Sequence, residues 1–570
     1  MKIIKVTVCI GLFIVASMFR PTELAAQQQG QQSTYKEQLI LVEAKLRSGD
    51  FNGALASLDE ALVKYPDVAD VHYAKALLFG QARNFAVAIP VAERAVELAP
   101  DNLVYSNYLV GLYKMNNELP KAIQTVDALL KIYPENEAIY REKMMLLYGS
   151  KRSEEALAVY ELAAGKFGVS DTLAIVKGEI LVDMGRLPEA EKLLQPWVDK
   201  GSKLRQVYST LGYISLENKN PKSAIQVIEK GIAHTNDNLL YLDLADAYAS
   251  TKKNKLAFEA LKKAFDATDV EFSDKYRVMF TALSGKTDLD ITQIHELANI
   301  LVIRHPRVAD SHVAKGEVLW RRGNLEEARA MFLTAVSMNR GHVEAWRMLI
   351  NVELALNKLD DALAHSFESL DANPNNAMLM YFTSMTYMVK EDYENARKML
   401  EKALDSSVDD TPYLQSLIYA GLGDLYHKLK MDDVSDVAYE EAIKLDSTNA
   451  VAMNNYAYYL SERNHNLELA AELSKTANEL EPNSSTYQDT YAWVLFKQAA
   501  YKDALKWIEK AIAGPQPSAL LFEHYGDILI KNGNAKEAVK QWSKALAQST
   551  GNDLNIDKLK SKIAKKSYVE

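Results

Sequence analysis

Cysteine is almost missing from this 570-residue sequence, since Cys9 is the only one. An internal disulfide is therefore excluded, as is a site built from several cysteine ligands. Glycine (24 residues) and proline (15 residues) are too few for a collagen-like or linker-rich chain. Basic residues are not in excess either: 66 Lys and Arg stand against 76 Asp and Glu, for a formal net charge of −10. Proteins that coat nucleic acid usually carry the opposite balance, so we expect no nucleic-acid partner.

A secretory signal peptide is predicted at the start of the chain, over residues 1–26. Lys2 and Lys5 form a basic n-region, and Val6–Phe19 is an uncharged, largely apolar run. This run is short for a membrane span but typical of a signal h-region. Ala26 is the small residue at the predicted cleavage point, directly before a run of glutamines.

Cleavage after Ala26 would remove Cys9 and leave a polar tail over residues 27–34. We therefore expect an exported protein, in the periplasm or cell envelope of a bacterium, with no transmembrane span after signal cleavage. An uncleaved membrane anchor is the alternative, although Arg20 and Pro21 end the apolar run early.

Alanine recurs at a fixed interval of 34 residues, which is the length of a structural repeat. The series runs through Ala54, Ala88, Ala122, Ala156, Ala190 and Ala224, returns at Ala328, Ala362 and Ala396, and returns again at Ala470, Ala504 and Ala538. A second column of mostly small residues follows seven positions later. Because the apolar residues around both columns are spaced by three, four and seven, the pattern predicts amphipathic helices.

Each repeat is predicted to hold two helices separated by a short break. Glycine takes the position of the break at Gly49, Gly185, Gly323 and Gly533, where a left-handed residue can end a helix. Prolines between repeats stop one helix before the next begins; they are Pro66, Pro100, Pro134, Pro374 and Pro482. The small columns would let neighbouring helices approach closely.

These columns resemble the tetratricopeptide repeat, whose pattern is an early aromatic, a Leu-Gly/Ala pair, a Tyr, and then Ala, an aromatic, Ala and Pro. Residues 205–238 carry Tyr208, Leu211, Gly212, Ala224 and Ile228, and residues 343–376 carry Trp346, Leu349, Ala362 and Pro374. The resemblance covers about residues 35–549. It implies an all-α fold, an α-solenoid of about fifteen helix-turn-helix repeats.

The repeats divide the chain into segments of unequal regularity. We expect an N-terminal array over 35–271 and a C-terminal array over 309–549, separated by a divergent repeat over 272–308 that could form a bend. An insertion near Pro412 interrupts the second array. Residues 550–570 are predicted to form a capping helix, with Leu559 on its apolar face and lysines including Lys562 facing solvent. A basic tail that touches an anionic surface is the alternative use of these lysines.

Motifs of catalysis or cofactor binding are not found. His295-Glu296 begins like a zinc-protease helix, but Asn299 stands where the second histidine is required. Gly421-Leu422-Gly423 follows no predicted strand, which excludes a dinucleotide-binding reading. The paired acids Glu326-Glu327 and Asp360-Asp361 are interpreted as solvent-facing charge. We predict no enzyme, and no catalytic, cofactor-binding or metal-binding residue.

The resemblance implies that the first helix of each repeat lines a concave groove. Read by repeat phase, the groove of the C-terminal array is rich in aromatic residues and methionine, with some amides and charges. We predict a partner-binding site there at Arg347, Asn351, Tyr381, Met385, Asn455, Tyr459, Asp489 and Trp493. Such side chains can bind an extended or helical peptide of another protein.

The functional prediction is a scaffold for other proteins in a cell-envelope assembly or secretion complex. The Lys, Asn and Arg clamp with which some members of the family hold acidic chaperone C-termini is not found in consecutive repeats. One alternative is an envelope protein that binds polysaccharide, since an aromatic groove also suits sugars. Another is an enzyme, or a non-catalytic subunit of an envelope enzyme. Partner, pathway and oligomeric state do not follow from the sequence.

Overall fold

The computed structural model describes residues 29–408, 410–515, 517–549 and 554–569. These residues form 31 α-helices and contain no strand, which confirms the predicted all-α class. The predicted signal peptide lies outside the described residues. The first helix, α2 (Gln29–Arg47), begins inside the segment that was expected to be a polar tail.

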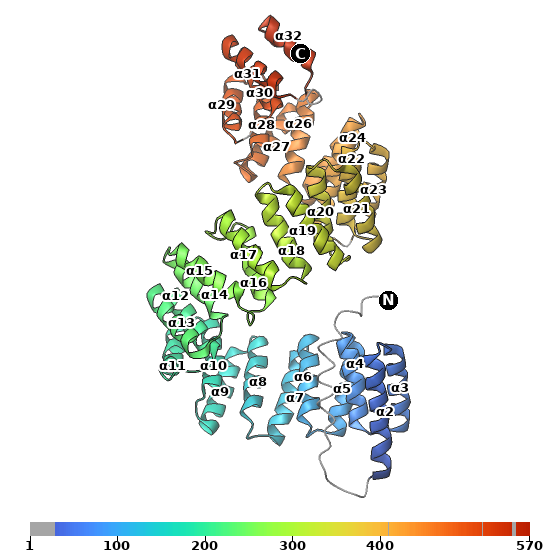
Figure 1. Ribbon diagram of the computed structural model, residues 1–570, viewed down its shortest axis with the longest axis vertical. Helices are drawn as coiled ribbons and strands as arrows, with labels where there is room; N and C mark the ends of the chain where they lie inside the picture. Colours follow the sequence, from blue (N-terminus) through green and yellow to red (C-terminus); the bar gives the residue numbers. More distant parts are fainter. Residues whose placement is uncertain (1–28, 409, 516, 550–553, 570) are drawn as a thin grey trace. The chain divides into compact units, whose positions relative to one another are not determined.

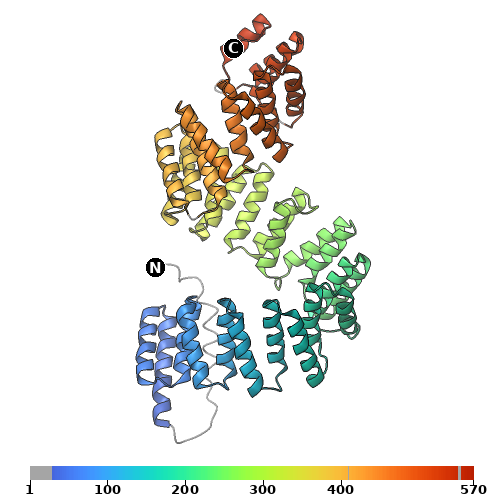
Figure 2. The same cartoon turned by 180° about the vertical axis from the view of Figure 1, so that it is seen from behind.

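The helices pair into antiparallel hairpins, and the chain divides into two compact units at Val270 and Glu271. In unit 1, seven hairpins follow one another in sequence order, blue to green in both views (Figure 1 and Figure 2). They are α2 with α3 (Phe51–Lys64), α4 (Ala69–Gln81) with α5 (Phe85–Leu98), α6 (Leu103–Met115) with α7 (Leu119–Ile132), α8 (Glu137–Gly149) with α9 (Ser153–Phe167), α10 (Asp171–Asp183) with α11 (Leu187–Asp199), α12 (Arg205–Glu217) with α13 (Pro221–Thr235), and α14 (Leu240–Ser250) with α15 (Asn254–Asp266).

Unit 2 contains eight hairpins and a final single helix. They are α16 (Phe272–Leu283) with α17 (Ile291–Arg304), α18 (Ala309–Arg321) with α19 (Leu325–Met338), α20 (Val343–Ala355) with α21 (Leu359–Ala372), α22 (Ala377–Val389) with α23 (Tyr393–Ser406), α24 (Pro412–Lys428) with α25 (Asp432–Leu445), α26 (Ala450–Glu462) with α27 (Leu467–Leu480), α28 (Ser485–Lys497) with α29 (Tyr501–Ile512), α30 (Ala519–Lys531) with α31 (Ala535–Gln548), and the single helix α32 (Ile556–Lys565). The divergent segment 272–308 is thus a helical hairpin, and the insertion near Pro412 lengthens α24 to 17 residues.

The break inside a hairpin is set by backbone conformation more than by glycine. Gly49, Gly185, Gly323 and Gly533 have the predicted positive φ angles, between 73° and 84°. Other hairpins adopt a left-handed conformation at the same place with a residue that carries a side chain: Arg83, Asn117, Lys151, Lys219, Lys252, Asn357, Glu391, Lys430, Asn464 and Ala499. The hairpin geometry therefore imposes this conformation even where an L-residue adopts it at some cost.

Close packing inside a hairpin depends on a small residue of the first helix that faces a large residue of the second. An added Cβ at several such glycines would lie within 3 Å of the facing side chain. The pairs are Gly178 with Leu194, Gly212 with Ile228, Gly316 with Phe332, Gly423 with Tyr439, and Gly526 with Trp542. All are 16 residues apart, so the repeat itself places them.

Substitution of Gly316 by alanine is expected to destabilise unit 2 by about 1–3 kcal/mol, because the new Cβ would lie 2.5 Å from the fully buried ring of Phe332. Urea unfolding followed by circular dichroism measures this change. The control is Gly165→Ala in α9, where no atom lies within 4 Å of the added Cβ. That change should stabilise by about 0.5–1 kcal/mol through helix propensity. Equal effects of the two changes would contradict the packing argument.

Candidate functional site

Side chains of neighbouring first helices meet at two regular separations, 31 and 35 residues. Tyr35 donates to Asp70 over 3.1 Å, and Tyr105 donates to the other oxygen of the same carboxylate. Trp493 Nε1 donates to Glu462 Oε1 over 2.7 Å, 31 residues earlier. A 34-residue repeat places equivalent positions on adjacent first helices, so one position more or three fewer brings two side chains together. This first-helix face is the surface on which the predicted groove residues lie.

The eight predicted groove residues all lie on first helices of unit 2. Arg347 and Asn351 belong to α20, Tyr381 and Met385 to α22, Asn455 and Tyr459 to α26, and Asp489 and Trp493 to α28. Asn351 and Met385 are half-buried. The structure does not gather the eight into one pocket but distributes them over three local sites.

The first local site surrounds Arg347. Its guanidinium donates two hydrogen bonds to Glu344, of 2.8 and 2.5 Å, and lies 5.7 Å from the centre of the Phe382 ring. Phe382 in turn packs edge-on against Tyr381, whose pKa burial raises to about 12. Arg347 also lines a hollow of about 560 Å³ between α20, α22 and the start of α24. Because its charge is already paired, Arg347 is held in place rather than left available as a clamp.

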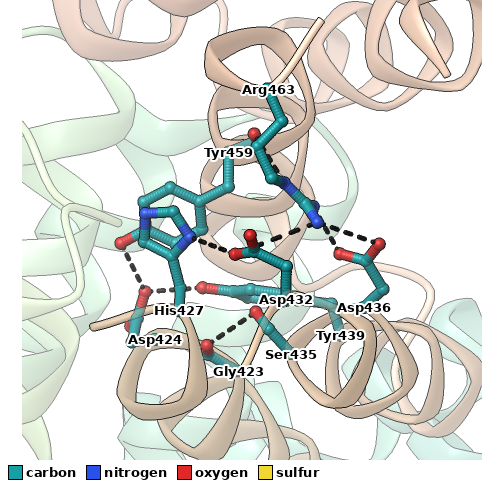
Figure 3. Close-up of polar contacts among 9 residues, drawn as sticks. All are labelled: Gly423, Asp424, His427, Asp432, Ser435, Asp436, Tyr439, Tyr459 and Arg463. Carbon is teal, nitrogen blue, oxygen red and sulfur yellow. Dashed lines mark hydrogen bonds and ion pairs between the residues drawn. The ribbon is translucent and has the colours of Figure 1, made fainter. Parts of the chain in front are cut away.

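The second local site is a buried cluster centred on the carboxylate of Asp424 in α24 (Figure 3). It accepts hydrogen bonds from Tyr439 (2.5 Å), Tyr459 (3.1 Å) and Asn455 (3.3 Å). Burial raises the pKa of Asp424, and the three donors oppose that rise by stabilising the ionised form. Asn455 and Tyr459 thus tie α26 to α24 and α25.

The same cluster extends to an ion pair through His427, whose ring stacks on Tyr459 at 3.7 Å (Figure 3). Asp432 lies 3.2 Å from His427 Nδ1 and 3.9 Å from Arg463, and Arg463 also contacts Asp436 at 2.5 Å. Burial lowers the pKa of His427 although Asp432 opposes this shift. One face of Tyr459 is therefore covered by a histidine ring.

The third local site joins α28 to α30 through Trp493 and His524. Trp493 is only 6% exposed, and its ring lies 4.0 Å from the imidazole of His524 and 4.8 Å from Phe496, nearly parallel to both. His524 Nδ1 lies 2.9 Å from Asp489 Oδ1. Two predicted groove residues, Asp489 and Trp493, are therefore engaged in contacts between repeats.

The pH dependence of stability should report the contact between His524 and Asp489. Burial opposes the protonated imidazole, but Asp489, with Asp527 and Glu462 nearby, raises the pKa of His524 above its ordinary value of 6.5. A raised folded-state pKa stabilises the protein below about pH 6.5, and this stabilisation is lost as pH rises through the folded-state pKa. Hydrogen exchange in α28 and α30 between pH 5.5 and 8.5 should therefore speed up less, after correction for the intrinsic rate, in Asp489→Asn than in the wild type. Parallel profiles would contradict this assignment.

The prediction that Lys562 faces solvent is wrong. Its side chain is 1% exposed, and its Nζ lies 2.6 Å from both Glu523 and Asp527 of α30. Trp542 donates a further hydrogen bond to Asp527 over 2.9 Å. Leu559, fully buried as expected, lies on α32 one turn before Lys562, so the final helix presents both an apolar residue and one cation to the last hairpin.

Unit 1 carries a larger open site, which the sequence reasoning did not single out. A hollow of about 720 Å³ opens on the first-helix face of α6, α8 and α10, and we call it the apolar hollow. Its aliphatic lining consists of Leu103, Val110, Val126, Leu129, Ala138, Ile139, Met145, Ile175, Val176 and Leu204. Met145 is 40% exposed there. Asn107, Asn136, Thr172 and Gln206 add hydrogen-bonding groups to the lining.

A second hollow of about 580 Å³, the acidic hollow, adjoins the first on α8, α10, α12 and α14. Its lining includes Glu179, Asp183, Asp243 and Asp246, with the phenols of Tyr148 and Tyr213. Among the described residues, Lys, Arg and His are absent from this lining. Glu179 lines both hollows; burial raises the pKa of its carboxyl, and the charge of Arg205 opposes the rise.

The signal for the tied residues was present in the sequence, in the separations of 31 and 35 residues between Asp424 and its donors, Asp489 and His524, and Asp527 and Lys562. The hollows left no comparable signal, because a hollow arises where side chains of three helices are short or turned away. The described residues contain no group of three or more His, Cys, Asp or Glu that could hold a metal ion. None of the helices in the described ranges combines the length and apolarity that a membrane crossing requires.

Comparison with curated proteins yields short, distant matches. The chain is 24% identical to human Protein O-mannosyl-transferase TMTC3 over 173 residues, which cover 30% of this chain and 19% of that protein. It is also 24% identical to TPR repeat-containing protein MJ1428 of Methanocaldococcus jannaschii over 282 residues, or 43% of this chain and 46% of that protein. The chain thus matches less than half the length of either relative.

Comparison with solved structures returns helical repeat proteins at low identity. A chain of the APC/C hetero-tetramer Cut9-Hcn1 aligns with 14% identity and a TM-score of 0.36, covering 79% of this chain and 94% of that chain. Yeast Tom70 aligns with 15% identity and a TM-score of 0.35, covering 89% and 95%. A tetratricopeptide repeat protein from Parabacteroides merdae gives 17% and 0.34, covering 45% and 98%. At these scores the alignments say nothing about function.

Family models described as Tetratricopeptide repeat match the chain in both units. One matches residues 41–102, 73–137 and 313–377, and a second matches residues 417–449. The matched ranges contain hairpins of the type described above, with the 34-residue period and the small columns. Such repeats suggest a protein-interaction scaffold. The chain belongs to the tetratricopeptide repeat family.

Proposed function

We propose that the protein is a non-catalytic scaffold that holds a segment of another protein on the first-helix face of unit 1. The observation that carries this proposal is the apolar hollow, about 720 Å³ in size and lined by consecutive first helices. Ligand sites are typically concave and mostly apolar, with a few polar groups that fix orientation. Asn107, Asn136 and Thr172 are suited to bind the backbone of an extended peptide.

Protein is a better candidate than polysaccharide for this surface. The aromatic residues Tyr459 and Trp493 were the groups best suited to stack on sugar rings. A histidine ring covers a face of each, at 3.7 Å and 4.0 Å respectively. The apolar hollow is lined by aliphatic side chains, which favour the apolar residues of a peptide. The non-catalytic assignment is supported by the extent of the helical hairpins, which take up nearly all described residues from Gln29 to Gln548.

Reversal of the character of the hollow tests the proposed function. Met145→Arg places a charge in the apolar lining, whereas Leu162→Arg makes the same change at a 67% exposed position of α9, on a second helix. Tagged full-length protein would be purified from its own cells, and co-purifying molecules would be identified by mass spectrometry and carbohydrate analysis. We expect a stoichiometric protein with the wild type and Leu162→Arg, but not with Met145→Arg. Retention of the same protein by Met145→Arg, or a glycan in its place, would contradict the proposal.

We also propose that the scaffold is exported and serves an assembly or secretion complex of a bacterial cell envelope. The basic n-region, the apolar run Val6–Phe19 and Ala26 support this proposal. N-terminal sequencing of the protein from the periplasmic fraction should begin at Gln27. A chain that retains Met1 in the cytoplasmic fraction would refute export.

A further inference from the structure

The apolar and acidic hollows form adjoining parts of one surface of unit 1. Glu179 of α10 lines both, and Tyr148 of α8 lines the acidic hollow on the helix that also carries Met145. First helices in this region contact their neighbours directly, from α8 to α10, α10 to α12 and α12 to α14. A single extended ligand that lies across these helices would therefore meet both hollows in turn.

The two hollows differ in charge. In the apolar hollow, Lys114 pairs with Glu142 at 3.0 Å, and Arg141 lies 3.9 Å from Glu137. These opposite charges offset one another, which leaves the apolar hollow close to neutral.

The acidic hollow has no such balance in its lining, because its four carboxylic acids are accompanied only by neutral side chains. Asp183 and Asp246 are exposed at its edge. The nearest basic group that acts on Glu179 is Arg205, which itself pairs with Asp237 at 3.3 Å. Burial together with the charges of Asp183 and Glu179 raises the pKa of Tyr148, as expected where carboxylates surround a phenol. A cationic group would be favoured at this end of the surface.

We propose that the segment bound by unit 1 carries a large apolar side chain, which enters the apolar hollow, and a cluster of Lys or Arg, which enters the acidic hollow. This inference rests on the proposed function and adds the chemistry of the partner. Packed helices lie about 10 Å apart, and an extended chain advances about 3.3 Å per residue. The apolar and basic residues of the partner are therefore expected about four to six positions apart.

The distinguishing feature of this partner is the order of its two elements, and labelled peptides of defined sequence probe it. Three 12-residue fluorescein peptides share one Phe and differ only five positions later, where they carry Lys-Arg-Lys, Glu-Asp-Glu or Ser-Ser-Ser. Each is also made in reversed order, because the direction of binding is open. Fluorescence anisotropy with the full-length protein measures each dissociation constant.

We expect at least one basic peptide to bind at least tenfold more tightly than the serine peptide of the same order, and both acidic peptides to bind most weakly. Asp183→Asn with Asp246→Asn should weaken the basic peptide about tenfold, since two exposed ion pairs are lost. Added salt should reduce the difference between the peptides. The control pair, Glu154→Gln with Asp199→Asn, removes two exposed acids from the second helices α9 and α11 and should leave binding unchanged.

Equal binding of basic and serine peptides, no binding by any peptide, or an unchanged basic peptide affinity in Asp183→Asn with Asp246→Asn would overturn this inference. Circular dichroism of both double variants confirms that they fold. These results are separable from a failure of the proposed function. A partner protein that is lost with Met145→Arg while the peptides show no charge preference would refute the basic segment and leave the scaffold intact.

Discussion

Replacement of Lys562 by methionine is expected to destabilise the last hairpin by about 3 kcal/mol. The ammonium lies 2.6 Å from both Glu523 and Asp527, and Asp527 is 1% exposed. Loss of the cation would leave two buried carboxyl groups without their shared partner, while the methionine retains most of the packing. Because helical repeats unfold in local units, hydrogen exchange in α30, α31 and α32 is the suitable measurement.

Two further variants separate charge from shape at this position. Lys565→Met changes an exposed lysine of the same helix and should leave exchange unchanged. Combination of Lys562→Met with Glu523→Gln and Asp527→Asn should recover part of the lost stability, since the uncompensated charges are then removed. Equal effects of Lys562→Met and Lys565→Met would show that Lys562 is not buried in the folded protein.

Truncation of Trp493 to alanine is expected to cost about 3–5 kcal/mol in the free energy of unfolding of unit 2. The indole is 6% exposed, packs between His524 and Phe496, and donates a hydrogen bond to Glu462. A residue that served only to contact a partner would affect binding and leave stability largely unchanged. Urea unfolding and hydrogen exchange of α26, α28 and α30 in the purified protein measure the change.

Tyr413→Ala is the matched control for Trp493→Ala. Tyr413 also lies on a first helix of unit 2, but it is 55% exposed. We expect its truncation to change stability by less than about 0.5 kcal/mol. If Trp493→Ala unfolded at the same urea concentration as this control, the prediction of a partner-binding role for Trp493 would regain its basis.

The fold was predictable because each of its requirements leaves a mark in every repeat. The small columns, the helical spacing and the prolines between repeats recur many times, so local variation averages out. Glycine was the less general signal: Lys219 and Glu391, among others, adopt the left-handed conformation that Gly185 and Gly323 adopt. The geometry of the hairpin requires the conformation, and glycine only makes it easier to reach.

The functional surface was less predictable than the fold. Repeat phase places residues such as Asn455 and Tyr459 on the first-helix face, but it does not tell whether a neighbouring helix already engages them. Asp424 and His427 do so, and both lie on the preceding first helix. Lys562 shows the same difficulty in reverse, since a lysine-rich helix hides one buried cation whose acidic partners lie 35 and 39 residues earlier.

The two units consequently offer different surfaces. In unit 2, polar and aromatic groups of successive first helices bind one another, which stabilises the contacts between repeats. In unit 1, the first helices from α6 to α14 leave two adjoining hollows, and one of them concentrates carboxylates. This contrast moves the proposed binding surface from the C-terminal array, where composition suggested it, to the N-terminal one.

Photo-crosslinking at single positions tests the proposed binding surface most directly. Full-length protein would carry p-benzoylphenylalanine either at position 145, in the apolar hollow, or at position 162, on the exposed side of α9. Irradiation of intact cells should join position 145 to one protein in high yield, and position 162 should give no such product. Crosslinks to the same protein at position 162 alone, with none at position 145, would contradict the proposal that the first-helix face of unit 1 holds the partner.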